Sequence, residues 1–218
     1  MKKKLKIALA ILVAFIILIA VLAALVISGP KSFPYTVADA EADSLLASEI
    51  VDMISDAIVD ENGDVPEIAV ITVPAENVNA LLRIAAYRLN REIKDQNIEC
   101  SLAWDNSAVK AVACIPLPLS KAVIVRGSAS PVIADGKLNA PLKGMKAGHL
   151  PLIGFNVVKK DITADDIEDE KLKLAFEAIH DLSAASDGSL KIGIYPAKIS
   201  NLTRILIMDE EETKSPQK

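Results

Sequence analysis

One uncharged apolar stretch dominates the hydropathy pattern of the chain. It comprises the twenty-one residues from Ile7 to Ile27, contains no proline or glycine, and is preceded by four lysines. A helix of that length rises about 1.5 Å per residue and spans roughly 30 Å, the hydrocarbon thickness of a bilayer. Lysines on its N-terminal side favour a cytoplasmic N-terminus. The pattern therefore predicts a single-pass anchor in the cytoplasmic membrane, with the rest of the chain outside the cytoplasm, on the periplasmic or outer face.

A cleaved secretory signal is the alternative interpretation of this stretch. Signal peptides have a shorter apolar region, of about 7–15 residues, followed by a small-x-small cleavage site. Residues 25–30, LVISGP, contain no such site, and no cysteine follows at which a lipoprotein would be lipidated. We therefore expect a basic tail at 1–6 and an uncleaved anchor at 7–28. Both interpretations export the bulk of the chain.

Helical and strand-like patterns alternate after the anchor. Two prolines mark an extended neck at 29–35. Helical periodicity predicts amphipathic helices from Thr36 to Val59 and from Pro74 to Lys94, and the β-branched run from Glu67 to Val73 predicts a strand between them. We expect a single extracytoplasmic domain over 36–208.

Apolar side chains recur at helical spacing in both predicted helices. The expected buried face of the first helix consists of Val37, Ala40, Leu45, Ile50, Met53, Ile54, Ala57 and Ile58. That of the second consists of Val78, Leu81, Leu82, Ala85, Ala86 and Leu89. Asn79 lies among the apolar positions of the second helix, where its amide either binds a backbone carbonyl or faces water.

From Asn97 onward the apolar positions mostly alternate, which predicts antiparallel strands. We expect strands at 98–104, 109–115, 122–130, 131–134 and 137–147, then at 189–195 and 198–208. Asp135-Gly136 predicts a type I′ turn, and Thr163 is expected to cap a third helix of about twenty residues that reaches Leu182. The charged end at 209–218 predicts disorder. The fold class is α+β: a curved antiparallel sheet of five to seven strands packed on two or three amphipathic helices.

The only two cysteines, Cys100 and Cys114, lie in the first predicted hairpin. If Trp104 stands opposite Lys110, Cys100 faces Cys114 on one side of the sheet. We therefore expect adjacent sulfur atoms, either as a disulfide or as two buried thiols. A two-residue loop would break this register. Trp104 itself could reach a membrane interface, but we expect it to pack in the core or to cover its rim.

Composition narrows the classes of partner. With the four N-terminal lysines set aside, 20 basic and 29 acidic residues remain, a net charge of −9. A domain with this charge is expected to bind nucleic acid poorly, because proteins gain most of that affinity by neutralising phosphates with basic side chains. The whole chain has only four Phe, three Tyr and one Trp, so a cavity would have mainly aliphatic walls. That composition favours an acyl chain over a planar ligand.

No motif with catalytic or metal-binding spacing is present. His149 and His180 lie in different elements without cysteine or carboxylate ligands at metal-site spacing, and the acidic run 165–170 lacks the pattern of a calcium loop. Gly136-Lys137 has no phosphate-loop frame, and residues 127–130 lack the second glycine of a nucleophile elbow. We therefore predict no catalytic residue, no metal and no cofactor.

Two segments carry a family resemblance: AENVNALLR at 75–83 and RGSASPVIADGKLNAPLKGMKAGHLPL at 126–152. They resemble the N-x-L-L helix, the turn and the G-x-L-P-L segment of YpmS-type anchored extracytoplasmic bacterial proteins. The similarity covers residues 70–195. That family's shape is similar to tubular lipid-binding domains, so the resemblance implies lipid handling or a scaffold role at the cell envelope.

We therefore expect non-enzymatic binding of a lipid or another apolar envelope molecule. The candidate groove on the second helix consists of Val78, Leu81, Leu82, Ala85 and Leu89. A module that docks an envelope protein is the alternative, and an envelope hydrolase is the third. An apolar groove would favour the first function, and a convergent polar cluster in a cleft would favour the third.

Overall fold

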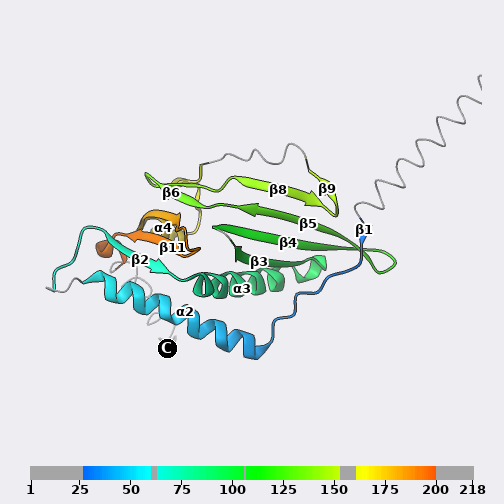
Figure 1. Ribbon diagram of the computed structural model, residues 1–218, viewed down its shortest axis with the longest axis horizontal. Helices are drawn as coiled ribbons and strands as arrows, with labels where there is room; N and C mark the ends of the chain where they lie inside the picture. The colour runs from blue at the N-terminus through cyan, green and yellow to red at the C-terminus, as the bar shows by residue number, and fades with distance from the viewer. Residues whose placement is uncertain (1–26, 60–62, 106, 153–160, 200–218) are drawn as a thin grey trace, which may run out of the picture.

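The computed structural model describes residues 27–59, 63–105, 107–152 and 161–199 (Figure 1). The predicted anchor before Ile27, the predicted strand after residue 199 and the charged tail lie outside the described residues. Among the helices that are described, none has both the length and the hydropathy needed to span a bilayer.

The described chain forms an α+β fold with two antiparallel sheets, so the prediction of one sheet is corrected. The large sheet has the order β3 (Glu99–Asp105), β4 (Ala108–Leu117), β5 (Lys121–Ala129), β8 (Leu142–Ala147) and β9 (Leu150–Pro151), with β1 (Ile27–Ser28) also paired to β5. The small sheet has the order β2 (Ala69–Val73), β11 (Leu190–Ile194), β10 (Ile179–Ala184), β6 (Val132–Ala134) and β7 (Lys137–Asn139).

Prolines mark the points where the chain changes sheet. The predicted strand 137–147 is wrong as one strand, because β7 belongs to the small sheet and β8 to the large one. Pro131 precedes β6 and Pro141 precedes β8, and a proline cannot donate to a strand ladder. The predicted turn between β6 and β7 is confirmed: Asp135 and Gly136 have φ of 51° and 68°, and Ala134 pairs with Lys137.

The first two helices are confirmed, as α2 (Val37–Ile58) and α3 (Ala75–Glu92), the latter followed by the 3-10 turn η1 (Lys94–Gln96). Thr36 and Asp39 form a capping box at the start of α2. The expected buried face of α2 is partly wrong, because Val37 and Leu45 are 76% and 69% exposed while Asp43 is buried. The helix is rotated so that Asp43 faces α3, where it finds a cationic partner.

The predicted twenty-residue third helix is also corrected. Thr163 caps only the 3-10 turn η3 (Ala164–Asp166), and the helix that follows, α4 (Glu170–Glu177), has eight residues. The chain then becomes β10, which pairs with β11 on one side and β6 on the other. The apolar residues of this segment have helical spacing, but hydrogen bonding to a strand on each side makes it a strand. Residues 196–199 are helical, so a strand does not begin at Lys198.

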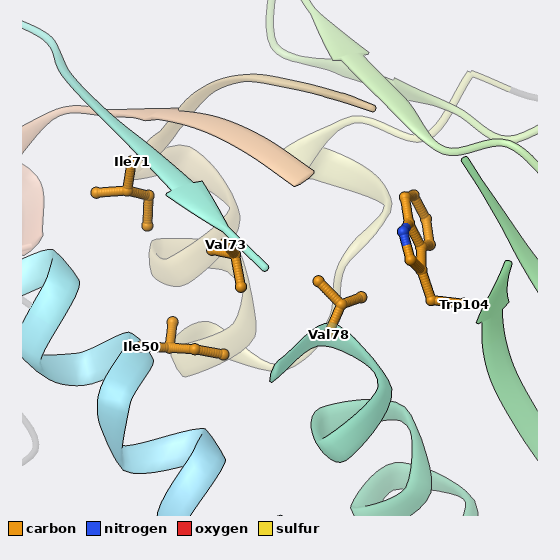
Figure 2. Close-up of a cluster of buried hydrophobic side chains, with 5 residues drawn as sticks. All are labelled: Ile50, Ile71, Val73, Val78 and Trp104. Carbon is orange, nitrogen blue, oxygen red and sulfur yellow. The ribbon is translucent and has the colours of Figure 1, made fainter. Parts of the chain in front are cut away.

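The main core lies where the two sheets meet α2 and α3 (Figure 2). Five buried side chains form it: Ile50, Ile71, Val73, Val78 and Trp104. Each fully buried side chain of this kind contributes about 1.5–3 kcal/mol. The Trp104 indole N–H donates to the Gly188 carbonyl at 2.6 Å, which links β3 to the hairpin of the small sheet. The predicted core position of Trp104 is confirmed.

Helix α3 covers the outer edge of β3 with two asparagines. The Asn79 amide accepts from the Trp104 N–H (2.7 Å) and donates to the Trp104 carbonyl (3.2 Å). Asn90 binds both backbone groups of Cys100 in the same way, at 2.7 and 2.8 Å. The two asparagines are about three helical turns apart and share one helix face. The amide of Asn79 therefore binds backbone, as one of its two predicted roles required, and the edge of β3 is protected from pairing with another chain.

Candidate functional site

The neck lies against the large sheet. Upstream of it, β1 pairs with residues 122–123 of β5. The Lys31 N–H then donates to Cys114 Sγ at 3.4 Å, and the Phe33 N–H donates to a carboxylate oxygen of Glu99 at 3.1 Å. The neck therefore runs across β5, β4 and β3 before it reaches α2 (Figure 1).

A buried carboxylate fastens the end of the neck to both helices. Asp43 of α2 accepts from the Tyr35 hydroxyl at 3.0 Å and from Arg83 Nε of α3 at 2.9 Å. The Arg83 guanidinium holds the pKa of Asp43 below its usual range. Burial, together with the hydrogen bond to Asp43, raises the pKa of Tyr35 to about 12. At neutral pH the cluster is therefore one carboxylate with one cationic and one neutral donor.

Aromatic rings continue the contact between the neck and α3. The rings of Tyr35 and Tyr87 lie 4.9 Å apart between centroids, with a tilt of 33°. The Arg91 guanidinium lies 6.0 Å from the centroid of the Tyr87 ring. Both distances fall within the ranges of aromatic pairing and cation–π attraction. Two of the three tyrosines of the chain thus meet at this one place.

A cleft opens between the neck, α3 and the start of β3. It has a volume of about 1010 Å³ and is lined by Ser32, Phe33, Pro34, Tyr35, Tyr87, Asn90, Arg91, Lys94, Asn97, Ile98, Glu99 and Pro116. We call these residues the neck cleft. A second cavity of about 260 Å³ lies under the same neck residues and reaches Ala86 and Leu102.

The lining of the neck cleft is amphipathic. Phe33, Tyr35, Tyr87 and Ile98 give it apolar walls, and it has two cations, Arg91 in the last turn of α3 and Lys94 at the start of η1. Glu99 is the only carboxylate among the described residues that line it. Such a site suits a ligand with an apolar body and an anionic group, because the guanidinium and ammonium can donate charge-assisted hydrogen bonds.

Comparison with protein-family models, curated proteins and solved structures finds no match to this chain. The chemistry of the neck cleft must therefore be interpreted from its own residues. The described residues of its lining include aromatic, cationic and amide side chains but no cysteine or histidine, the side chains most often used to bind transition metals.

The five residues of the predicted groove do not form one wall. Val78 lies in the core and Leu82 packs against that core, whereas Leu81 and Leu89 are 44% and 40% exposed. Ala85 is also exposed. None of the five lines the neck cleft. The contact between α3 and β3 instead uses the helix face that carries Asn79 and Asn90.

The predicted pairing of the cysteines is wrong. Asp105 pairs with Ala108, so the hairpin loop has two residues and Cys100 stands opposite Ala113. A shift of one residue places the two side chains on opposite faces of the sheet. Both cysteines are buried free thiols, and burial raises the pKa of Cys100.

A second polar cluster lies in the small sheet. His180 Nδ1 is 2.9 Å from an Asp181 carboxylate oxygen, and the His180 ring meets the edge of Tyr195 at 5.3 Å. These rings border a cavity of about 290 Å³ that also contacts Lys198 and Glu177. No serine, threonine or cysteine is among its described lining residues, and no metal-ligand cluster occurs in the described part of the chain.

Proposed function

We propose that the chain binds an anionic phospholipid in the neck cleft and that it does so without chemical turnover. The observation that carries the proposal is the location of the cleft. It lies under the segment that joins the predicted anchor to the domain, so its ligand would be drawn from the adjacent leaflet.

The size of the cleft supports a lipid rather than a small ion. Ligand pockets are typically about 300–1,000 Å³, and this cleft, at about 1010 Å³, is at the upper end of that range. Each methylene group buried against its rings would contribute about 0.8 kcal/mol. Part of one acyl chain would therefore give useful affinity.

The charge of the cleft supports an anionic head group. The chain after the four N-terminal lysines has a net charge of −9, yet Arg91 and Lys94 outnumber Glu99, the one carboxylate among the described residues of the cleft lining. Arginine and lysine both bind phosphate, arginine in a bidentate manner. The asparagines Asn90 and Asn97 offer further donors beside them.

The short path from the predicted anchor to the cleft supports a membrane source for the ligand. Ile27, the last residue of the predicted apolar span, is already paired with Val123 in the large sheet, and Ser32 lines the cleft. Five residues extend over at most about 18 Å. A lipid could therefore enter the cleft with little exposure of its acyl chain to water.

Lipid titration of the intact chain tests this proposal. The chain, stripped of lipid in detergent, is titrated with a fluorescent anionic phospholipid and, separately, with its zwitterionic analogue. The double variant R91Q/K94Q is expected to bind the anionic lipid at least about ten-fold more weakly, because each lost charge-assisted bond is worth about 1.5–3 kcal/mol. The control K143Q/K146Q makes the same charge change at two exposed positions of β8. Equal affinity in the two double variants would contradict the proposal.

A protein-docking role is the second candidate, and one feature of α2 favours it. Val37 and Leu45 are exposed and border a shallow hollow on the outer side of that helix. A hydrophobic face of this kind can accept a helix of a partner protein. The variant L45E should abolish capture of such a partner and leave lipid affinity unchanged. The resemblance to YpmS-type proteins is compatible with both proposals.

A further inference from the structure

The tip of the β4–β5 loop carries an apolar side chain that packs against nothing. Leu119 is 92% exposed, more than any other large hydrophobic residue in the described part of the chain. Its neighbours in the loop are Pro118 and Ser120. The loop is short, because Leu117 pairs with Lys121. Burial in the protein therefore does not account for leucine at this position.

The backbone does not account for it either. Leu119 and Ser120 have φ of 63° and 53°, in the left-handed region that favours glycine, asparagine or aspartate. A leucine there has both an unfavourable backbone conformation and an exposed apolar side chain. An apolar surrounding outside the folded chain would explain why a leucine stands at position 119.

Two further exposed isoleucines lie at the same end of the large sheet. Ile115, Val123 and Ile27 stand opposite one another across β4, β5 and β1, so they share one face of the sheet. Ile115 and Ile27 are 37% and 38% exposed. Lys121 is two strand residues, about 7 Å, from Val123, and Leu119 lies in the turn two residues before Lys121. We call Ile27, Ile115 and Leu119 the loop-end patch.

We propose that the loop-end patch enters the interface of the lipid bilayer, with Leu119 among the acyl chains. The membrane is the partner because the predicted apolar span of the chain ends at Ile27, inside the patch. Exposed lysines at positions 31 and 121 flank the patch, where their ammonium groups can reach lipid phosphates.

The contacts of the neck fix which end of the domain faces the membrane. A flexible tether would let the domain turn freely. Here β1 is paired with β5, and the backbone N–H groups of Lys31 and Phe33 donate hydrogen bonds to side chains of β4 and β3. The chain therefore leaves the domain at a set position beside the β4–β5 loop (Figure 1). This inference concerns the orientation of the domain on the bilayer and does not depend on a lipid in the neck cleft.

Quenching of tryptophan fluorescence by brominated lipids tests the inference on the intact chain. The only native tryptophan, Trp104, is buried and gives a constant background. The variant L119W is reconstituted in vesicles of phospholipid with or without bromine on the acyl chains. The control L172W adds a tryptophan at a position on α4 that is also exposed, at 63%, and lies in a different part of the fold.

We expect brominated lipid to reduce the added fluorescence of L119W at least about two-fold and to leave that of L172W unchanged. Equal quenching in the two variants would overturn the inference. The same measurement in an R91Q/K94Q background separates it from the proposed function, since those substitutions should weaken lipid binding in the cleft while L119W stays quenched. A variant L119N, which suits the left-handed backbone, should keep the fold and weaken the association of the loop with the bilayer. Equal amide-exchange protection at residues 119–121 in L119N and in the native chain, both in vesicles, would also count against the inference.

Discussion

The core junction and the neck end of this molecule are built by different physical means. At the core junction, aliphatic side chains pack around Trp104, and Val73 is only 1% exposed. At the neck end, hydrogen bonds, one ion pair and aromatic stacking hold a segment over a cavity of about 1010 Å³. Polar contacts of this kind contribute less net stability than apolar burial of the same extent.

This difference separates stability from function within one domain. Regions that open to admit ligands are drawn from the less stable parts of a structure. The neck is held mainly by hydrogen bonds and one aromatic contact, whereas α2 and α3 are held by buried apolar side chains of the core. We therefore expect substitutions at the core junction to unfold the domain and those at the neck end to change ligand binding first.

The largest effect is expected from W104A at the core junction. Loss of a buried tryptophan costs about 3–5 kcal/mol in the free energy of unfolding. A guanidinium titration of the detergent-solubilised chain, followed by circular dichroism, measures the change. The control L172A removes an exposed side chain and should change stability by no more than about 0.5 kcal/mol. A cost below about 1 kcal/mol for W104A would show that the core lies elsewhere.

A smaller loss is expected from D43N at the neck end. The substitution removes the charge that binds Arg83, and hydrogen bonds to charged groups are worth about 1.5–3 kcal/mol. We expect a loss of about 2 kcal/mol in the same titration, because Arg83 is half exposed and keeps part of its hydration. The variant D52N makes the same change at an exposed site of α2 and should be nearly neutral. Equal stabilities of the two variants would mean that Asp43 does not fasten the neck.

The stability that Tyr35 contributes to the fold should decrease at alkaline pH. Its folded pKa of about 12 lies above the ordinary value near 10, so the stability it adds is complete below pH 10 and is lost as the pH rises towards 12. The difference in stability between the native chain and Y35F should therefore shrink between pH 9 and pH 11.5. A constant difference would contradict the buried hydrogen bond to Asp43. Asp43 contributes stability in its charged form, because its pKa is lowered in the folded chain. That stability is lost as the pH falls below about 4 and the carboxylate is protonated.

The smallest effect concerns the cysteines, which lie on opposite faces of the large sheet. Without reductant, an alkylating reagent should label both thiols in the unfolded chain and neither in the folded one, since both are buried. Mild oxidant should leave the midpoint of unfolding unchanged. A disulfide found by mass spectrometry would require the register of β3 and β4 to shift by one residue.

Local patterns could predict most elements but not their assembly. The helical spacing from Val37 and the Asp135-Gly136 turn are properties of short segments, and both predictions are confirmed. The strand β10 could not be found in this way, because its apolar residues also fit a helix and only its two neighbouring strands decide the outcome. The predicted register of the cysteines was wrong for a similar reason. A loop that is one residue shorter or longer shifts the pairing, and a shift of one residue places the two cysteines on opposite faces.

The candidate site was less accessible to prediction than the fold. Asp43 and Arg83 are forty positions apart, and no spacing rule connects them. A signal was present nevertheless, because Asp43 interrupts the apolar face of a helix and such a residue needs a buried partner. The neck cleft depends on a segment that the sequence presents only as a proline-marked linker. Two of its contacts with the sheet are donated by backbone N–H groups, which leave no trace in a residue pattern.

Photocrosslinking in membranes tests the central claim, that the neck cleft binds an anionic phospholipid, most directly. The intact chain is reconstituted with a trace of an anionic phospholipid that carries a photoreactive acyl chain, and the labelled peptides are mapped by mass spectrometry. We predict that lipid attaches within residues 32–35 and 87–99, and that an excess of unlabelled anionic lipid competes for these sites more strongly than a zwitterionic lipid does. Labelling confined to the loop-end patch, or spread over α4 and the small sheet, would contradict the claim.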